Sequence, residues 1–165
     1  GYSGGGKSMI NYFKQSDHEP FFNYGLKLNH KHLPEIIYHN KLKITPVFSP
    51  SVGDFIQGMI VSIPLHFSWF NYKVDTEKIQ SVIEEFYLAA KFIRVLKKDE
   101  GISDNGYFRP DNLVGTNCLD ISIFGNDDND QLIICSRLDN LGKGASGAAI
   151  QSMNIALGFD ETLGL

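Results

Sequence analysis

The sequence predicts an α+β fold in which a mixed, mostly antiparallel sheet is covered on one face by helices. Met59–His66 is a strongly apolar run of strand length, and Thr116–Phe124 and Gln131–Leu138 read as the two arms of a β-hairpin. Residues 75–90 and 141–157 instead carry apolar residues at helical spacing. The hairpin and the edge strand predict the sheet, and the two helical segments predict its cover.

The composition is that of an ordinary globular domain. A length of 165 residues predicts one domain with a sizeable core. The net charge of −4 provides no basic surface for nucleic acid, no apolar run is long enough to span a membrane, and no signal peptide is apparent. Cys118 and Cys135 lack CxxC spacing, which fits reduced core residues in the cytoplasm better than a disulfide.

The first residues read like the middle of a working loop, so we expect the chain to be a fragment. Ser3–Lys7 is predicted to be a glycine-rich turn, since three consecutive glycines permit positive φ and a close approach by a ligand. The segment lacks the spacing of a phosphate loop, and a flexible linker explains it equally well. Residues 11–24 are polar with scattered aromatics and are predicted to form a loop.

Two histidines, His30 and His32, precede a short predicted helix. Imidazole takes and gives protons near neutral pH, so one residue between them allows both to serve a single site. Pro34 suits the first turn of a helix and Glu35 complements its dipole. The helix should run from Pro34 to His39, with Asn40 as its C-cap. A solvated pair with no function is the alternative.

Two strands are predicted next along the chain. Lys41–Phe48 alternates over its first half, with Pro46 placing its end at an edge or a bulge, and Ser49–Gly53 follows as a turn. In Met59–His66, Pro64 argues against a central position or marks a bulge.

The helix over residues 75–90 is capped by Asp75 or Thr76. Its predicted buried stripe comprises Ile79, Val82, Ile83, Phe86 and Ala90. Lys91–Leu96 could extend this helix or form a strand, because its residues also alternate. Lys97–Pro110 is then a polar connection.

The last long element, Leu141–Leu157, follows the hairpin and is capped by Asp139-Asn140. Its first half is glycine-rich, so something must approach it closely, either packed backbone or a cofactor or subunit. Its predicted buried stripe is Ile150, Met153 and Leu157, and Gly158 ends it. The acidic turn Gly125–Asp130 of the hairpin lacks a distal bidentate Glu, so no metal site is expected.

Five sets of residues, in chain order, match one set of motifs: GYSGGG (1–6), HKHLPEI (30–36), ITP with GMI (44–46 and 58–60), GTNCLDI (115–121), and NLGKGASGAA through MN and GFDETL (140–163). They resemble the SGxSGAG loop, the HRHxPEI segment, the FTPH…GI region, the GSNFCDI segment and the C-terminal signature of N-acetyl-gamma-glutamyl-phosphate reductases. The resemblance extends over essentially the whole chain, so the chain is identified as the C-terminal domain of a member of that family.

The resemblance implies a domain like the C-terminal domains of glyceraldehyde-3-phosphate and aspartate-semialdehyde dehydrogenases. Residues 1–165 would form one substrate-binding and dimerisation domain, and the N-terminal dinucleotide-binding domain would be absent from this chain. A homodimer or homotetramer is implied, built through the exposed face of the sheet.

The reaction that it implies is the NADPH-dependent conversion of N-acetyl-glutamyl 5-phosphate to the 5-semialdehyde in arginine biosynthesis. A cysteine thiolate takes the acyl group before reduction, which splits one difficult step into two. The family's NPGC segment, which carries that cysteine, is absent from this sequence, and so is the glycine fingerprint of the nucleotide domain. This chain alone is therefore expected to be inactive.

The resemblance also assigns roles to residues. His30 and His32 would be catalytic, with Lys31 and Glu35 binding substrate. Lys31 replaces the commoner Arg and loses its bidentate fork, and Val47 stands where the family often has His. The NADP-facing residues would be Ser3, Gly4, Gly5, Gly6, Asn140, Gly142, Lys143 and Gly144. The likeness also favours a strand for residues 91–96.

Two alternatives remain open. A non-catalytic interaction or dimerisation module of the same ancestry is favoured by the missing thiolate and nucleotide fold. An enzyme like aspartate-semialdehyde dehydrogenase is the other alternative, although HKHLPEI and the DETLGL ending fit it poorly.

Overall fold

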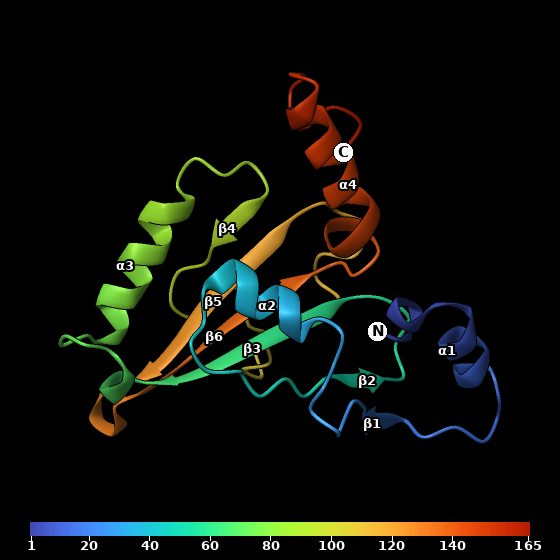
Figure 1. Cartoon of the computed structure of the whole chain (residues 1–165), viewed down its shortest axis with the longest axis horizontal. Coiled ribbons are helices and arrows are strands. Elements are labelled where there is room, and N and C mark those ends of the chain that lie inside the picture. The colour runs from blue at the N-terminus through green and yellow to red at the C-terminus, as the bar shows by residue number, and fades with distance from the viewer. The chain divides into compact units, whose positions relative to one another are not determined.

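The computed structural model describes residues 1–165, which divide into two compact units, Gly1–Ile56 and Gln57–Leu165. Each unit is described by itself (Figure 1). The sequence prediction of a single domain stays a prediction. No helix combines the length and the apolar character needed to cross a bilayer.

The first unit contains two short helices and a two-stranded sheet. A 3₁₀ turn, Tyr2–Gly5, leads into helix α1 (Gly6–Phe13), and helix α2 spans Leu33–Asn40. Strands β1 (Phe21–Asn23) and β2 (Ser51–Gly53) pair antiparallel.

Aromatic rings and a histidine hold this unit together. Phe13 is buried and stacks between Tyr2 and Phe22, with ring centroids 4.9 and 6.0 Å away. Both nitrogens of His18 face acceptors, the Gln15 carbonyl at 2.6 Å and the Asp54 carboxylate at 3.1 Å. The bond to the Gln15 carbonyl, followed by the bond to Asp54, raises the pKa of His18 above its ordinary value.

Several predictions for the first unit are wrong. No strand forms over Lys41–Phe48, and Ser51–Gly53, predicted to be a turn, is strand β2. The predicted loop over residues 11–24 contains the end of α1 and all of β1. Pro46 has no N–H for a ladder, and residues 41–45 are all exposed, so the alternating run finds neither partner nor core. Helix α2 is confirmed, but its C-cap is Lys41, in the left-handed conformation with φ 51°, and not Asn40.

The second unit is built on a four-stranded sheet in the order β3-β6-β5-β4 (Figure 1). Strand β3 is Met59–His66, β4 is Ile93–Val95, β5 is Leu119–Asn126 and β6 is Gln131–Leu138. Strand β6 pairs antiparallel with both β3 and β5, whereas β4 pairs parallel with β5. The predicted mixed, mostly antiparallel sheet in an α+β fold is confirmed.

The strand predictions are confirmed with small shifts at their ends. The bounds of β3 and β6 are as predicted, and Pro64 lies on an edge strand with unbroken register. The hairpin forms, but β5 begins at Leu119 and not at Thr116. Residues 93–95 form a strand, so the helical alternative for residues 91–96 is wrong.

Helix α3 (Thr76–Tyr87) packs against β4 and β5, and the Asp75 carboxylate caps it by accepting the Lys78 N–H at 2.7 Å. The core beneath it joins Ile79 to Ile123 and Leu132. Val82 and Phe86, predicted to be buried, are 49% and 78% exposed. The helix also ends before Ala90, the last residue of the predicted stripe.

The last helical segment begins as a π-helical turn, Gly142–Ser146, and continues as helix α4 (Gly147–Ala156) at one end of the sheet (Figure 1). Gly158 has φ +73°, and the N–H groups of residues 158 and 159 close a Schellman motif on Ile155 and Asn154. The predicted buried stripe is wrong, because Met153 and Leu157 are 52% and 62% exposed.

The buried residues of α4 are instead Gly147 and Asn154. Asn154 donates its amide hydrogens to the carbonyls of Glu161 and Leu163, at 3.3 and 2.8 Å. A polar side chain therefore fixes the C-terminal residues against this helix.

Candidate functional site

The two histidines of the first unit lie at the start of α2. His32 is the N-cap residue, and its backbone N–H donates to Nδ1 of His30 at 3.3 Å. The ring centroids of His30 and His32 are 4.8 Å apart. His30 is half-buried against Phe48 and Tyr24, at centroid distances of 4.9 and 5.9 Å, whereas His32 is exposed.

This geometry selects a tautomer of His30. Because Nδ1 accepts a hydrogen bond, the neutral ring carries its proton on Nε2. His30 can therefore present a single donor while its other nitrogen is held by the chain. The two predicted substrate residues, Lys31 and Glu35, are exposed, and Val47 is 81% exposed.

The glycine-rich start of the chain is a compact turn. The N–H of Ser3 donates to the carbonyl of Ile56 at 3.1 Å, and Ser3 is buried. Gly4, Gly5 and Gly6 are exposed, and Gly6 adopts φ +68°, which favours glycine. The space where a Cβ would lie is open at Gly6 but is filled at Gly5 by the Met9 side chain.

The remaining predicted cofactor residues lie in the second unit, between β6 and α4. The side-chain oxygen of Asn140 accepts the N–H of Gly58 at 2.7 Å, and the Gly144 N–H donates to the Asp139 carbonyl at 2.8 Å. Gly144 is exposed and Gly142 is half-buried.

Close packing explains two of the glycines in this segment. A Cβ on Gly142 would lie 2.5 Å from the Thr116 carbonyl oxygen, and one on Gly147 would overlap the Asn117 side-chain oxygen. The predicted close approach therefore comes, at these two positions, from the turn that precedes β5. Asn117 is buried, and this oxygen has no hydrogen-bond partner.

Replacing Gly147 with alanine should destabilise the protein by about 1–3 kcal/mol, because overpacking displaces the Asn117 amide. Replacing a glycine with alanine inside a helix usually has the opposite effect and stabilises a protein by about 1 kcal/mol. Urea unfolding followed by circular dichroism measures the change. Ser152→Ala, at an exposed position of the same helix, is the control and should change stability by less than about 0.5 kcal/mol. Stabilisation by Gly147→Ala would contradict the packing argument.

Lys143 is engaged by neighbouring side chains of the second unit. Its ammonium donates to the Gln151 oxygen at 2.6 Å and lies 5.7 Å from the Phe92 ring centroid. Desolvation lowers the pKa of Lys143, although the nearby Glu161 carboxylate opposes that shift. Gln151 also donates to the Glu161 carboxylate at 3.1 Å, so it links Lys143 to the C-terminal residues.

Sequence reasoning missed two residues of this region. Asp139 was predicted only as a helix cap, and Gln57 was assigned no role. The Gln57 amide donates to the Asp139 carboxylate at 2.6 Å across 82 residues of sequence. A polar residue directly after a buried strand was the available signal for Asp139, whereas nothing local marks Gln57.

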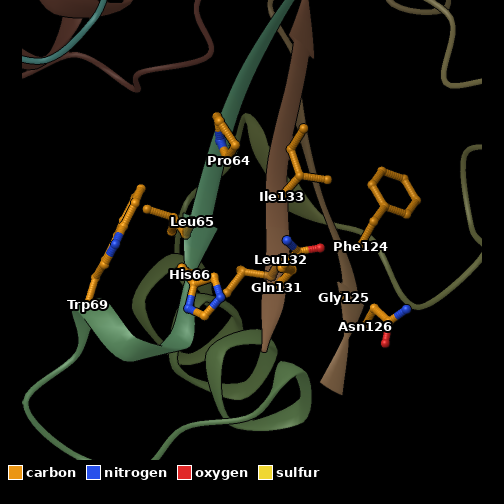
Figure 2. Close-up of a pocket in the computed structure, with 10 residues that line it drawn as sticks. All are labelled: Pro64, Leu65, His66, Trp69, Phe124, Gly125, Asn126, Gln131, Leu132 and Ile133. Carbon is orange, nitrogen blue, oxygen red and sulfur yellow. The ribbon is translucent and has the colours of Figure 1, made fainter. Parts of the chain in front are cut away.

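A hollow of about 590 Å³ lies at the hairpin end of the sheet (Figure 2). It is lined by Trp69, Pro64, His66, Ile133 and Phe124, among others. Trp69 is 69% exposed, so this hollow presents aromatic and aliphatic surface. The sequence indicated only an edge strand here.

Comparisons with known proteins agree on one family. Residues 1–140 match the family described as the semialdehyde dehydrogenase, dimerisation domain. The chain is 44% identical over 176 residues to "N-acetyl-gamma-glutamyl-phosphate reductase 2" of Nostoc sp., covering 100% of this chain and 54% of that protein. It is also 44% identical, with the same coverage, to "N-acetyl-gamma-glutamyl-phosphate reductase" of Trichormus variabilis. The Brucella ovis protein of that name is 40% identical over 163 residues, 96% of this chain and 52% of that protein. The chain thus spans about half the length of the curated relatives that it matches.

Proposed function

The chain belongs to the semialdehyde dehydrogenase dimerisation-domain family, and on that premise we propose that it is the C-terminal part of an N-acetyl-gamma-glutamyl-phosphate reductase. The observation that carries the proposal is 40–44% identity to proteins of that name over 96–100% of the chain. The whole protein would be an NADP-dependent oxidoreductase of arginine biosynthesis that acts in the cytoplasm. Its dinucleotide-binding domain and nucleophilic cysteine would lie N-terminal to these residues.

In this proposal NADPH supplies the hydride, and residues of this chain hold and protonate the reacting groups. In the first unit, Gly4 and Gly6 are exposed, as a cofactor contact there would require. In the second unit, Gly144 is exposed in the turn after β6. His30 donates its Nε2 proton to the oxygen that becomes negative when the acyl carbon is reduced. Lys31 provides positive charge for the substrate's phosphate or carboxylate, and His32 provides a hydrogen-bonding group beside it.

The decisive experiment is an NADPH-oxidation assay with N-acetyl-glutamyl phosphate, performed on the full-length protein and on this chain alone. The full-length protein should oxidise NADPH and form the semialdehyde, whereas this chain should not. A full-length protein that folds but produces no semialdehyde would overturn the proposal. In that case self-association without turnover would favour an interaction module of the same ancestry.

We further propose that two or four copies assemble through the hollow at the hairpin end of the sheet. Strand β3 is an edge strand, and the hollow is lined by Pro64, Ile133 and Trp69, the last of which is 69% exposed. A second copy would cover these apolar side chains, as expected for a family described by its dimerisation.

Light scattering on the full-length protein tests this surface. Trp69→Glu should at least halve the measured mass, because it places a charge in the interface. Tyr38→Glu, which changes an aromatic residue that is 78% exposed in the first unit, is the matched control and should leave the mass unchanged. An unchanged mass for Trp69→Glu would place the interface elsewhere.

A further inference from the structure

A buried carboxylate lies at the base of the turn that contains Asn140. Asp139 is 1% exposed, and its Oδ1 accepts the Leu141 N–H at 2.8 Å. Its Oδ2 accepts the Gln57 side chain at 2.6 Å and the Gly115 N–H at 2.8 Å. The N–H of Gly142 adds a fourth hydrogen bond.

These bonds join three segments that are far apart in the sequence. Gln57 leads into β3, Gly115 belongs to the turn before β5, and residues 141–142 begin the π-helical turn. Each segment donates an N–H to the same carboxylate, and these bonds satisfy the oxygens of a side chain that is itself buried.

The same junction orients Asn140. Its side-chain oxygen accepts the N–H of Gly58, the residue after Gln57. Gly58 has φ +106°, and a Cβ there would overlap the Pro110 carbonyl, so its backbone has little freedom to move. Movement of the 57–58 segment would therefore shift the Asn140 side chain.

The chemistry of this position requires a carboxylate. Desolvation by burial raises the pKa of Asp139, but the bond from Gln57 and the three backbone N–H bonds outweigh it and hold the pKa below its ordinary value. A carboxylate offers only acceptors to these donors. An asparagine would direct its own NH₂ at one of them, leaving two donors facing each other.

We infer that Asp139 is a positioning residue that fixes the Asn140–Gly144 turn by tying it to Gln57 and Gly115. The anchoring follows from the second unit alone. Its consequence for the cofactor rests on the proposed function, in which this turn faces NADP. A correctly placed turn contributes mainly to cofactor binding, so its loss should raise the cofactor KM more than it lowers kcat.

The test is Asp139→Asn in the full-length protein. Amide hydrogen exchange should accelerate at least about tenfold in segments 57–59, 113–117 and 140–146, because their shared acceptor is lost. The KM for NADPH should rise at least about tenfold, with kcat reduced less than about threefold. Gln57→Met, which removes one donor and leaves the carboxylate, should produce smaller changes in the same direction and serves if Asp139→Asn does not fold.

Asp75→Asn is the matched control, because asparagine caps a helix as well as aspartate does. It should leave both exchange in these segments and the KM unchanged. If the wild-type protein lacks reductase activity, the proposed function fails. The hydrogen-exchange data alone then test whether Asp139 anchors the Asn140–Gly144 turn. Unchanged exchange in segments 57–59 and 140–146 would overturn the inference. Faster exchange with an unchanged NADPH KM in an active enzyme would overturn its link to the cofactor.

Discussion

Asp120→Ala should lower the free energy of unfolding by about 3–5 kcal/mol, because it leaves a buried guanidinium without its counter-charge. Asp120 is fully buried and Arg137 is 4% exposed. The Asp120 carboxylate accepts Nε and Nη2 of Arg137 at 2.9 and 2.8 Å. On its other oxygen it accepts the same two groups of Arg94, both at 2.7 Å.

The three residues are paired directly across β4, β5 and β6, so one carboxylate joins three strands. Arg137 is fixed further by donating to the Gly101 carbonyl at 2.7 Å and by the Phe108 ring, whose centroid is 4.7 Å from its guanidinium carbon. The Arg137 guanidinium is buried, so removing Asp120 leaves its charge without a counter-charge in a desolvated position, and the expected loss is large.

Urea unfolding of the full-length protein measures the loss, with Asp111→Ala as the control. Asp111 forms the same kind of pair with Arg109, but both side chains are about half exposed, and such pairs contribute about 0–1 kcal/mol. If Asp120→Ala proves insoluble, Asp120→Leu combined with Arg137→Met should restore folding, because it removes both charges. Similar losses for Asp120→Ala and Asp111→Ala would contradict this account.

Features that a short stretch of sequence encodes were predicted well. The apolar pattern placed β3 and β6, and the Asp75 cap marked the start of α3. The hydrophobic pattern of a strand and the cap of a helix each depend on residues that are close in sequence, so both can be recognised without knowing a distant partner.

The first unit shows the opposite case. Strands β1 and β2 have three residues each and depend on pairing across about 30 positions of sequence. Neither is long enough for alternating apolar and polar residues to identify it as a strand, whereas Lys41–Phe48 shows such alternation but pairs with no other strand. In α3 the buried residue is Ile79, which belongs to the core cluster with Ile123 of β5, whereas Val82 and Phe86 follow the same pattern and remain exposed.

Buried polar residues were the main failure at the candidate site. A hydrophobic stripe was predicted for the last helix, but Asn154 is its buried side chain because two carbonyls of the C-terminal residues meet it there. Asp120 and Asp139 are buried for the same reason, since their donors come from other strands and turns. Sequence spacing indicates where a polar residue lies in an element, but not whether distant donors will satisfy it.

His30→Asn in the full-length enzyme should lower kcat by about 10²–10⁴-fold, the usual contribution of a general acid, with little change in the KM for NADPH. The expectation rests on the proposed reaction and on the contacts of His30 in the first unit. Its Nδ1 is occupied by the His32 N–H, and Phe48 and Tyr24 hold the ring, so Nε2 is the group available for proton transfer.

His32 provides the comparison within the pair, because its backbone and not its ring supports His30. His32→Asn keeps that N–H, so its effect on kcat should be clearly smaller, and the effect should appear mainly in the KM for the acyl phosphate if the ring contacts substrate. His39→Asn, at an exposed position of helix α2, should change neither kcat nor KM. It is the control for replacing a histidine in this unit. Steady-state kinetics with both substrates varied separates these outcomes. A larger loss of kcat for His32→Asn than for His30→Asn would identify His32 as the general acid. Equal losses of kcat and cofactor affinity in His30→Asn would mean that His30 supports binding and not proton transfer.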